Sequence, residues 1–105
     1  MPSYKSYLDF VLEQLADLKD ITYRVMMGEF IIYYQGKVIG GIYDNRFLVK
    51  PTKSAIKMMT NAKREFPYPG AKAMLLVDNL EDKVFLHKLF DAIAKELPLN
   101  KKHKI

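Results

Sequence analysis

The sequence has 105 residues, of which 50% are apolar, and it carries a net charge of +5. This length and composition predict one domain with a packed core and leave no room for a second domain. The absence of cysteine excludes disulfides, thiolate metal sites and cysteine nucleophiles. No apolar run approaches the ~20 residues that span a bilayer, and the first residues do not look like a signal peptide. We therefore expect a cytoplasmic protein with no membrane partner.

The first predicted element is a helix at about residues 3–18. Apolar side chains recur there at the spacing of one helix face, and Ser3 stands at the position of an N-cap. The residues of this apolar stripe are Tyr4, Tyr7, Leu8, Val11, Leu12 and Leu15.

Residues 21–50 predict a β-meander. β-Branched and aromatic residues dominate this stretch, and turn residues punctuate it. Two-residue hairpin connections are predicted at residues 35–36 (Gln-Gly) and 44–45 (Asp-Asn), and Gly28 marks a further tight turn or a bulge. Because short connections join antiparallel neighbours, we expect antiparallel strands at residues 22–27, 29–34, 37–43 and 46–50.

Both faces of this sheet are predicted to be covered. In the second strand, one face carries three apolar residues and the other face two, namely Phe30, Ile32 and Tyr34 against Ile31 and Tyr33. A sheet with one solvated face would alternate apolar and polar residues instead. We therefore expect both faces to be covered, and helices of the chain itself or of a second copy could supply this cover.

A second helix is predicted at about residues 53–65, with Thr52 as its N-cap and a basic outer face. The run FPYPG at residues 66–70 breaks this helix. One more strand is then expected at residues 73–77.

The last predicted element is a third helix, capped by Asp78 or Asn79 and ended by Pro98. Its apolar stripe consists of Leu86, Leu89, Phe90, Ile93 and Leu97. The predicted fold is therefore α+β, an antiparallel β-meander packed by helices in the order α-β-β-β-β-α-β-α. We expect a single domain at residues 1–97 and a basic C-terminal tail at residues 98–105.

The sequence contains no recognisable catalytic or metal-binding constellation. His87 falls on the polar face of the third helix and His103 in the tail, and neither has a second ligand at metal-binding spacing. There is no nucleophile elbow, phosphate loop or dinucleotide fingerprint. We therefore predict a non-enzymatic protein without cofactor or metal, with His87 as a surface residue.

The positive charge is concentrated in the middle third of the chain. Residues 37–72 contain eight basic and two acidic residues, whereas residues 1–36 have a net charge of −2. Such a concentration is typical of a nucleic-acid footprint, and the alternative is a solvated lysine-rich surface. The candidate binding surface consists of Lys50, Lys53, Lys57, Lys63, Arg64 and Lys72.

Three tyrosines of the meander, Tyr33, Tyr34 and Tyr43, form a candidate interface. Aromatic side chains beside basic residues can stack on bases, and the alternative is that they pack the sheet against helices. Five methionines are predicted to fill the core, namely Met26, Met27, Met58, Met59 and Met74.

The run RVMMGEFIIYYQGKVIG begins at Arg24, follows the helical segment FVLEQL at residues 10–15, and continues through Asp44, Arg46, Leu48 and Lys50. This pattern resembles the N-terminal domain of the TfoX/Sxy competence-regulator family over about residues 4–97. Met27 stands where that family has phenylalanine, and larger members continue into a second domain. The resemblance implies an α+β domain with an antiparallel sheet packed by helices, and a role in regulating DNA-uptake genes.

Three hypotheses for the function follow. The first is a non-enzymatic regulatory or protein-interaction domain of the TfoX N-terminal kind, which binds a protein partner or a second copy of itself as a homodimer. The second is a nucleic-acid-binding module that uses the basic region at residues 50–72. The third is a small-ligand-binding protein or enzyme with a pocket between the sheet and the helices.

Overall fold

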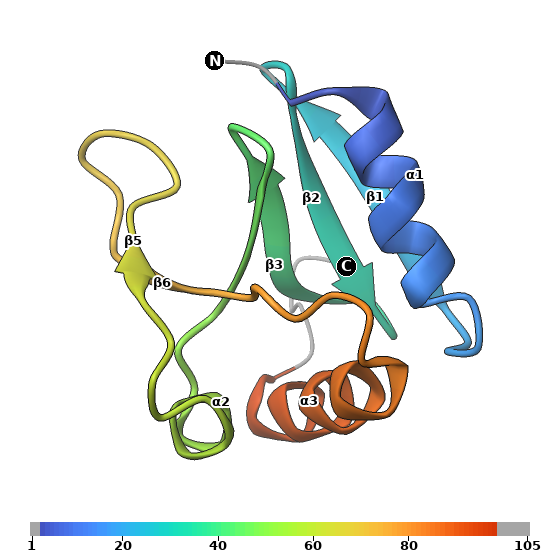
Figure 1. Ribbon diagram of the computed structural model, residues 1–105, viewed down its shortest axis with the longest axis vertical. Coiled ribbons are helices and arrows are strands. Elements are labelled where there is room, and N and C mark those ends of the chain that lie inside the picture. The colour runs from blue at the N-terminus through green and yellow to red at the C-terminus, as the bar shows by residue number, and fades with distance from the viewer. Residues whose placement is uncertain (1–2, 99–105) are drawn as a thin grey trace, which may run out of the picture.

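A computed structural model describes residues 3–98. In this part of the chain, helices and strands follow one another as α1 (Lys5–Gln14), β1 (Ile21–Met26), β2 (Glu29–Tyr34), β3 (Lys37–Tyr43), β4 (Arg46–Val49), α2 (Lys53–Met58), β5 (Arg64–Glu65), β6 (Met74–Leu76) and α3 (Lys83–Glu96) (Figure 1). The predicted α+β class and antiparallel meander are confirmed. The short strand β5 is an addition to the predicted order.

All strands form one antiparallel sheet in the order β1-β2-β3-β4-β6-β5. The three hairpins of the meander turn through two residues each, at residues 27–28, 35–36 and 44–45. All six turn residues have a positive φ, between 52° and 85°. This geometry matches the right-handed twist of paired strands, which explains why the predicted hairpins form where the sequence places them.

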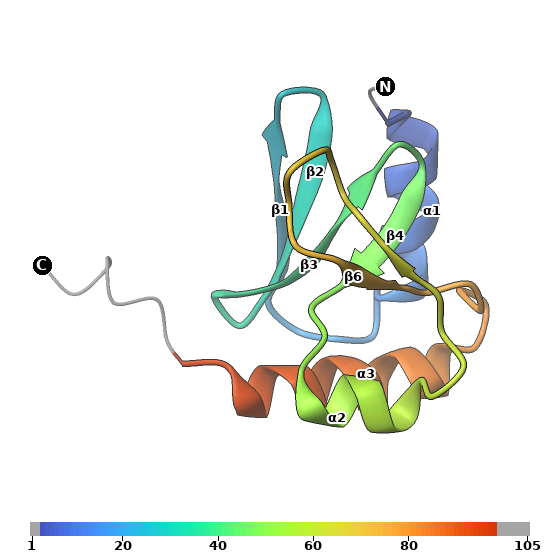
Figure 2. The same cartoon turned by 90° about the vertical axis from the view of Figure 1, so that its left-hand side faces the viewer.

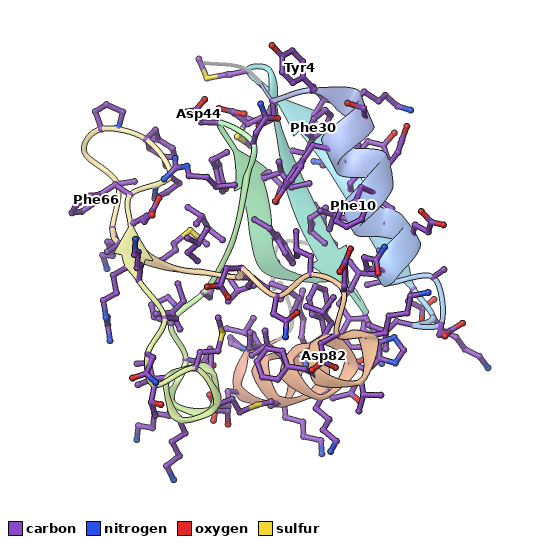
Figure 3. The ribbon with its side chains drawn as sticks, viewed as in Figure 1. Tyr4, Phe10, Phe30, Asp44, Phe66 and Asp82 are labelled. Carbon is purple, nitrogen blue, oxygen red and sulfur yellow. The ribbon has the colours of Figure 1, made fainter. Side chains whose placement is uncertain are left out.

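All three helices pack on the same face of the sheet, which we call the inner face. Its core joins α1 and α3 to the strands through fully buried side chains, among them Leu8, Ile32, Phe47 and Phe90. Ala55 brings α2 into the same core, and Figures 1 and 2 show α2 and α3 side by side. In Figure 3, Phe10 and Phe30 lie between α1 and the sheet.

The opposite face of the sheet, the outer face, has no helix on it in the part of the chain that the structure describes. A separate cluster of three buried residues, Ile31, Tyr43 and Leu48, lies there. The outer face thus carries buried residues, as predicted, although no helix of the described chain supplies the cover. The apolar outer side chains of the strands are covered instead by the loop between β5 and β6.

Ser3 is not the N-cap of the first helix. Its hydroxyl donates to Glu29 Oε1 at 2.6 Å and accepts from the Asn45 N–H at 2.9 Å, so it joins two hairpin turns. The residue before α1 is Tyr4, whose side chain makes no capping hydrogen bond. The helix itself, at Lys5–Gln14, is shorter at both ends than the predicted helix at residues 3–18.

The other two helices also differ from the prediction at their ends. α2 stops at Met58 because the chain then leaves to pair Arg64 and Glu65 with β6. α3 begins later than predicted, because Asp82 rather than Asp78 or Asn79 caps it by accepting from the Phe85 N–H at 3.0 Å.

The predicted basic tail, with His103, lies outside the described residues after Pro98. Within the described residues, the structure contains no helix that is long and apolar enough to cross a membrane.

The meander depends on Gly40, where β3 and β4 approach closely. A Cβ atom at this position would collide with the Leu48 carbonyl oxygen and would lie 2.8 Å from Val49 Cα. Both neighbours are backbone atoms of a buried strand, so neither can move aside independently.

We expect Gly40→Ala to lower the free energy of unfolding by more than about 2 kcal/mol, because the methyl group would push β3 and β4 apart. Gly36→Ala is the control, since Gly36 has a φ of +78° but open space around it, and its strain costs about 1 kcal/mol. Urea denaturation measures both changes. An equal effect of the two substitutions would contradict the close-approach explanation.

Candidate functional site

The outer face of the sheet is an apolar surface that is only partly covered. Around the buried cluster, Tyr33, Val38, Met74 and Leu76 are only half-buried. Figure 2 looks onto this face, across which the loop between β5 and β6 runs. The strands therefore place a row of apolar side chains where solvent still reaches them.

The loop at residues 66–73 is held over the outer face at two points. At its start, Arg46 forms an ion pair with Glu65 at 2.7 Å and donates to the Phe66 carbonyl at 3.2 Å. Further along, the Tyr68 ring packs on Tyr43 with 6.2 Å between ring centroids. This loop leaves Phe66 61% and Tyr68 59% exposed, and Figure 3 shows Phe66 pointing away from the molecule.

A groove of about 390 Å³ lies between this loop and the sheet. We call it the outer groove. Apolar and aromatic side chains form most of its lining, and two lysines stand in its wall. No acidic residue is among those that line it, which are Val38, Tyr43, Lys50, Pro51, Thr52, Pro67, Tyr68, Ala71, Lys72, Ala73 and Met74. The outer groove is therefore apolar and positively charged.

Tyr43 in this groove is held in its neutral form. Burial raises the pKa of its phenol, and the nearby Tyr68, Glu29 and Tyr33 raise that pKa further. A phenol with a raised pKa does not serve as a base near neutral pH. Tyr43 is thus suited to packing and to hydrogen-bond donation rather than to proton abstraction.

The six predicted basic residues do not form one surface. Lys50 and Lys72 both line the outer groove. Lys53 and Lys57 lie exposed on α2, and the exposed Lys63 and Arg64 lie at the sheet edge formed by β5. Only the first pair comes together with aromatic side chains.

The three predicted interface tyrosines are also separated. Tyr33 and Tyr43 point to the outer face, where Tyr33 is half-buried and Tyr43 is 9% exposed. Tyr34 points to the inner face and is 5% exposed. The three therefore do not form one exposed patch.

Tyr34 joins the sheet to α3. Its hydroxyl donates to Asp91 Oδ1 at 2.6 Å, and its ring packs edge-on against Phe90. The hydrogen bond to Asp91, followed by burial, raises the pKa of Tyr34 to about 12. The pKa values of Tyr7 and Tyr43 are raised as well, mainly by burial.

We expect stability to fall at alkaline pH. A tyrosine whose pKa is raised on folding stabilises the protein fully below its unfolded pKa of about 10. That contribution is lost as the pH rises through 10 towards 12. Urea denaturation at a series of pH values should show this fall.

The same measurement on Tyr34→Phe should show a smaller fall in stability at alkaline pH. At neutral pH the free energy of unfolding should be lower by about 1 kcal/mol, because the variant lacks the hydrogen bond to Asp91. Tyr4→Phe, at a tyrosine that is 68% exposed, is the control. An unchanged alkaline fall in Tyr34→Phe would contradict the assignment.

The most exposed apolar side chains of the sheet lie on β1 and its turn, and the sequence analysis missed them. Val25 is 64% exposed, Met26 54% and Met27 96%. The prediction of Met26 and Met27 as core fillers is therefore wrong. The sequence does carry a signal that this strand is partly solvated. Thr22 and Arg24 alternate with apolar residues only in this strand, and such alternation is typical of a strand with one solvated face. The remaining methionines, Met58, Met59 and Met74, do pack against the cores.

Among residues 3–98, no group of histidine, aspartate and glutamate side chains could hold a metal ion. His87 is half-buried rather than on the surface, and within this part of the chain its buried Nε2 atom has no hydrogen-bond partner. His87 is thus less exposed than the prediction of a surface residue implies.

Comparison with known proteins shows the family of the chain. The chain is 33% identical over 105 residues to the "Uncharacterized 12.7 kDa protein in trpE 5'region" of Spirochaeta aurantia, and the matched segment covers 99% of this chain and 91% of that protein. The chain belongs to the same family as that protein. No family model matches the sequence, and no solved structure matches it.

Proposed function

We propose that the protein is a non-enzymatic regulatory domain of the cytoplasm that works by binding a protein partner, with the outer groove as its contact surface. The observation that carries this proposal is the incomplete cover of the outer face. Four apolar side chains around its buried cluster are half-buried, and the Tyr68 ring, which lines the outer groove, is 59% exposed. Aromatic residues in a partly desolvated pocket are typical anchors of protein interfaces.

The charge of the outer groove indicates what charge its partner should carry. Lys50 and Lys72 stand in its wall without an acidic residue among the lining residues. A partner with an apolar side chain flanked by carboxylates would fill the groove and pair with both ammonium groups. We therefore propose an acidic, partly apolar segment of another protein as the ligand.

The regulatory part of the proposal comes from the resemblance of the meander to TfoX/Sxy N-terminal domains. Members of that family regulate DNA-uptake genes, and this chain shares their motif of structural residues rather than a reactive group. In the proposed role the domain acts on gene expression through its partner, either another protein or a second copy in a homodimer.

The test is photocrosslinking in the native cytosol. A benzophenone amino acid at position 68, beside the outer groove, should give nuclease-resistant protein adducts. The same group at position 84 is the control, because Val84 is 65% exposed on α3 and does not line the outer groove. Mass spectrometry of the adducts identifies the partner.

A transcription regulator among the adducts would support the regulatory role. Identical adducts from positions 68 and 84, or no protein adducts from position 68, would overturn the outer groove as the contact surface.

A second candidate function is nucleic-acid binding, and one observation favours it. The structure brings Lys50 and Lys72 together with Tyr43 and Tyr68 in one groove. A lysine-lined groove with aromatic rings is the arrangement by which sheets bind single strands, since bases stack on rings while lysines contact phosphates.

This candidate predicts a measurable salt dependence. The affinity for single-stranded oligonucleotides should fall with salt, and Lys50→Gln with Lys72→Gln should lower the log–log slope by about 1.4, which is about 0.7 for each phosphate contact. Lys53→Gln with Lys57→Gln removes the same charge from α2 and is the control. Equal slopes for the two double variants, or no binding at low salt, would contradict this function.

A further inference from the structure

The two edges of the sheet differ in how they are protected. β5 forms one edge and consists of two charged residues, Arg64 and Glu65. β1 forms the other edge and is six residues long, with Arg24 as its one charged side chain. Short length and charge protect an edge strand from pairing with other chains. By these criteria β5 is protected and β1 is open.

The hydrogen-bonding groups that β1 leaves free can be assigned. Asp20 accepts from the Gln35 N–H at 3.0 Å, so its carbonyl points towards β2. Along an antiparallel strand, residues alternate between facing the partner strand and facing away from it. The N–H and C=O groups of Ile21, Tyr23 and Val25 therefore face outward at the edge of the sheet.

Met27, in the turn that follows β1, has an unfavourable environment in two respects. It is 96% exposed although it is apolar, and its φ is +53°, a conformation that suits asparagine or glycine in such a turn. A residue that breaks two local rules without a visible gain in the isolated chain is a candidate for a role in binding.

A second apolar groove, of about 500 Å³, lies between the C-terminal part of α1 and β1. It contains no charged residue in its lining, which consists of Leu12, Leu15, Ala16, Leu18, Ile21, Thr22 and Tyr23. We call it the edge groove. The edge groove lies at the start of β1, whereas the exposed Val25 lies near the end of this strand and Met27 in the turn that follows it.

We propose that this edge binds a second copy of the chain, with the two β1 strands antiparallel and the two-fold axis at Tyr23. In this register the outward groups of Ile21 pair with those of the partner's Val25, and the reverse pair forms by symmetry. The two sheets then become one continuous sheet. This inference rests on the proposed role in protein interaction and names one partner for it.

Two features of the strand fit a second copy. First, the antiparallel register places the end of one strand beside the start of the other, so Val25 and Met27 of each copy lie beside the edge groove of its partner. Second, Arg24 stands opposite the partner's Thr22 in this register. With the axis at Arg24 instead, two guanidinium groups would face each other, which is unfavourable.

Sedimentation of the full chain tests the proposal. We expect a dimer at tens of micromolar. Val25→Lys should raise the dimer dissociation constant about tenfold or more, because each interface then contains two buried ammonium groups. Val84→Lys is the matched control, since Val84 on α3 has the same exposure, 65% against 64%, and this substitution should leave the dimer unchanged.

Met27→Asn gives a second readout that a purely structural role would not produce. Asparagine accepts the positive φ of this turn, so the variant should resist urea better than the natural chain. It should also dimerise more weakly, because the exposed apolar side chain is gone. Greater stability with unchanged dimerisation would remove Met27 from the interface.

Cysteine substitution tests the register, because the chain has no cysteine of its own. Tyr23→Cys places two thiols across the axis, about 5.5 Å apart between Cα atoms, a spacing that permits a disulfide. Arg24→Cys places them as diagonal neighbours at about 7–8 Å, which is too far. A covalent dimer should therefore form at position 23 and not at position 24, with circular dichroism confirming that both variants fold.

Three results would overturn the inference: a monomer at about 100 micromolar, a dimer that Val25→Lys does not weaken, or a disulfide at position 24 but not at position 23. Photocrosslinking at position 68 separates this inference from the proposed function. If position 68 captures a protein while the chain is monomeric, the edge pairing fails and the proposed function stands. If the dimer forms through β1 but position 68 gives no adduct, the edge pairing stands and the role of the outer groove fails.

Discussion

The structure depends on one packing arrangement: three helices cover a single face of the sheet. The apolar stripes of α1 and α3 meet the inner side chains of β2, β3 and β4, and both Phe47 and Phe90 are fully buried between them. Burial of each such side chain contributes about 1.5–3 kcal/mol. Tyr34 adds a polar link across the same interface through Asp91. The position of every other segment follows from this core, because it determines which side of each strand remains free.

The two proposed contact surfaces lie where this one-sided packing leaves the sheet without a helix. No helix covers the outer face within the described residues, so a proline-containing loop performs that task, and it does so incompletely. The helices also stop short of the edge at β1, where Val25 and Met26 remain in solvent. Both surfaces are apolar at their centres, and only the outer groove has charged residues in its wall, namely Lys50 and Lys72. They lie on the same sheet, so a partner on either one would bear on a rigid element.

Local patterns predicted local structure well. The strand bounds at β2 and β3 and the two hairpin turns after them follow directly from turn chemistry and from alternating side chains. Tertiary contacts decided what the pattern could not. Ser3 looks like a helix cap in sequence, but it bonds to Glu29 and Asn45, which are distant along the chain. In the same way, a two-sided apolar strand indicates that both faces are buried, without specifying whether a helix or a loop buries them. Basic residues that are near in sequence are separated because some lie on α2 and others at the sheet edge formed by β5.

The contrast between the two edges of the sheet has a consequence for the size of any assembly. A sheet with two open edges can add copies without limit, and this is how strand addition leads to fibres. Here the far edge is two residues long and bears a positive and a negative side chain. Pairing through β1, as proposed, would therefore end after a single addition, so the chain could leave one strand edge open for pairing and still form an assembly of limited size.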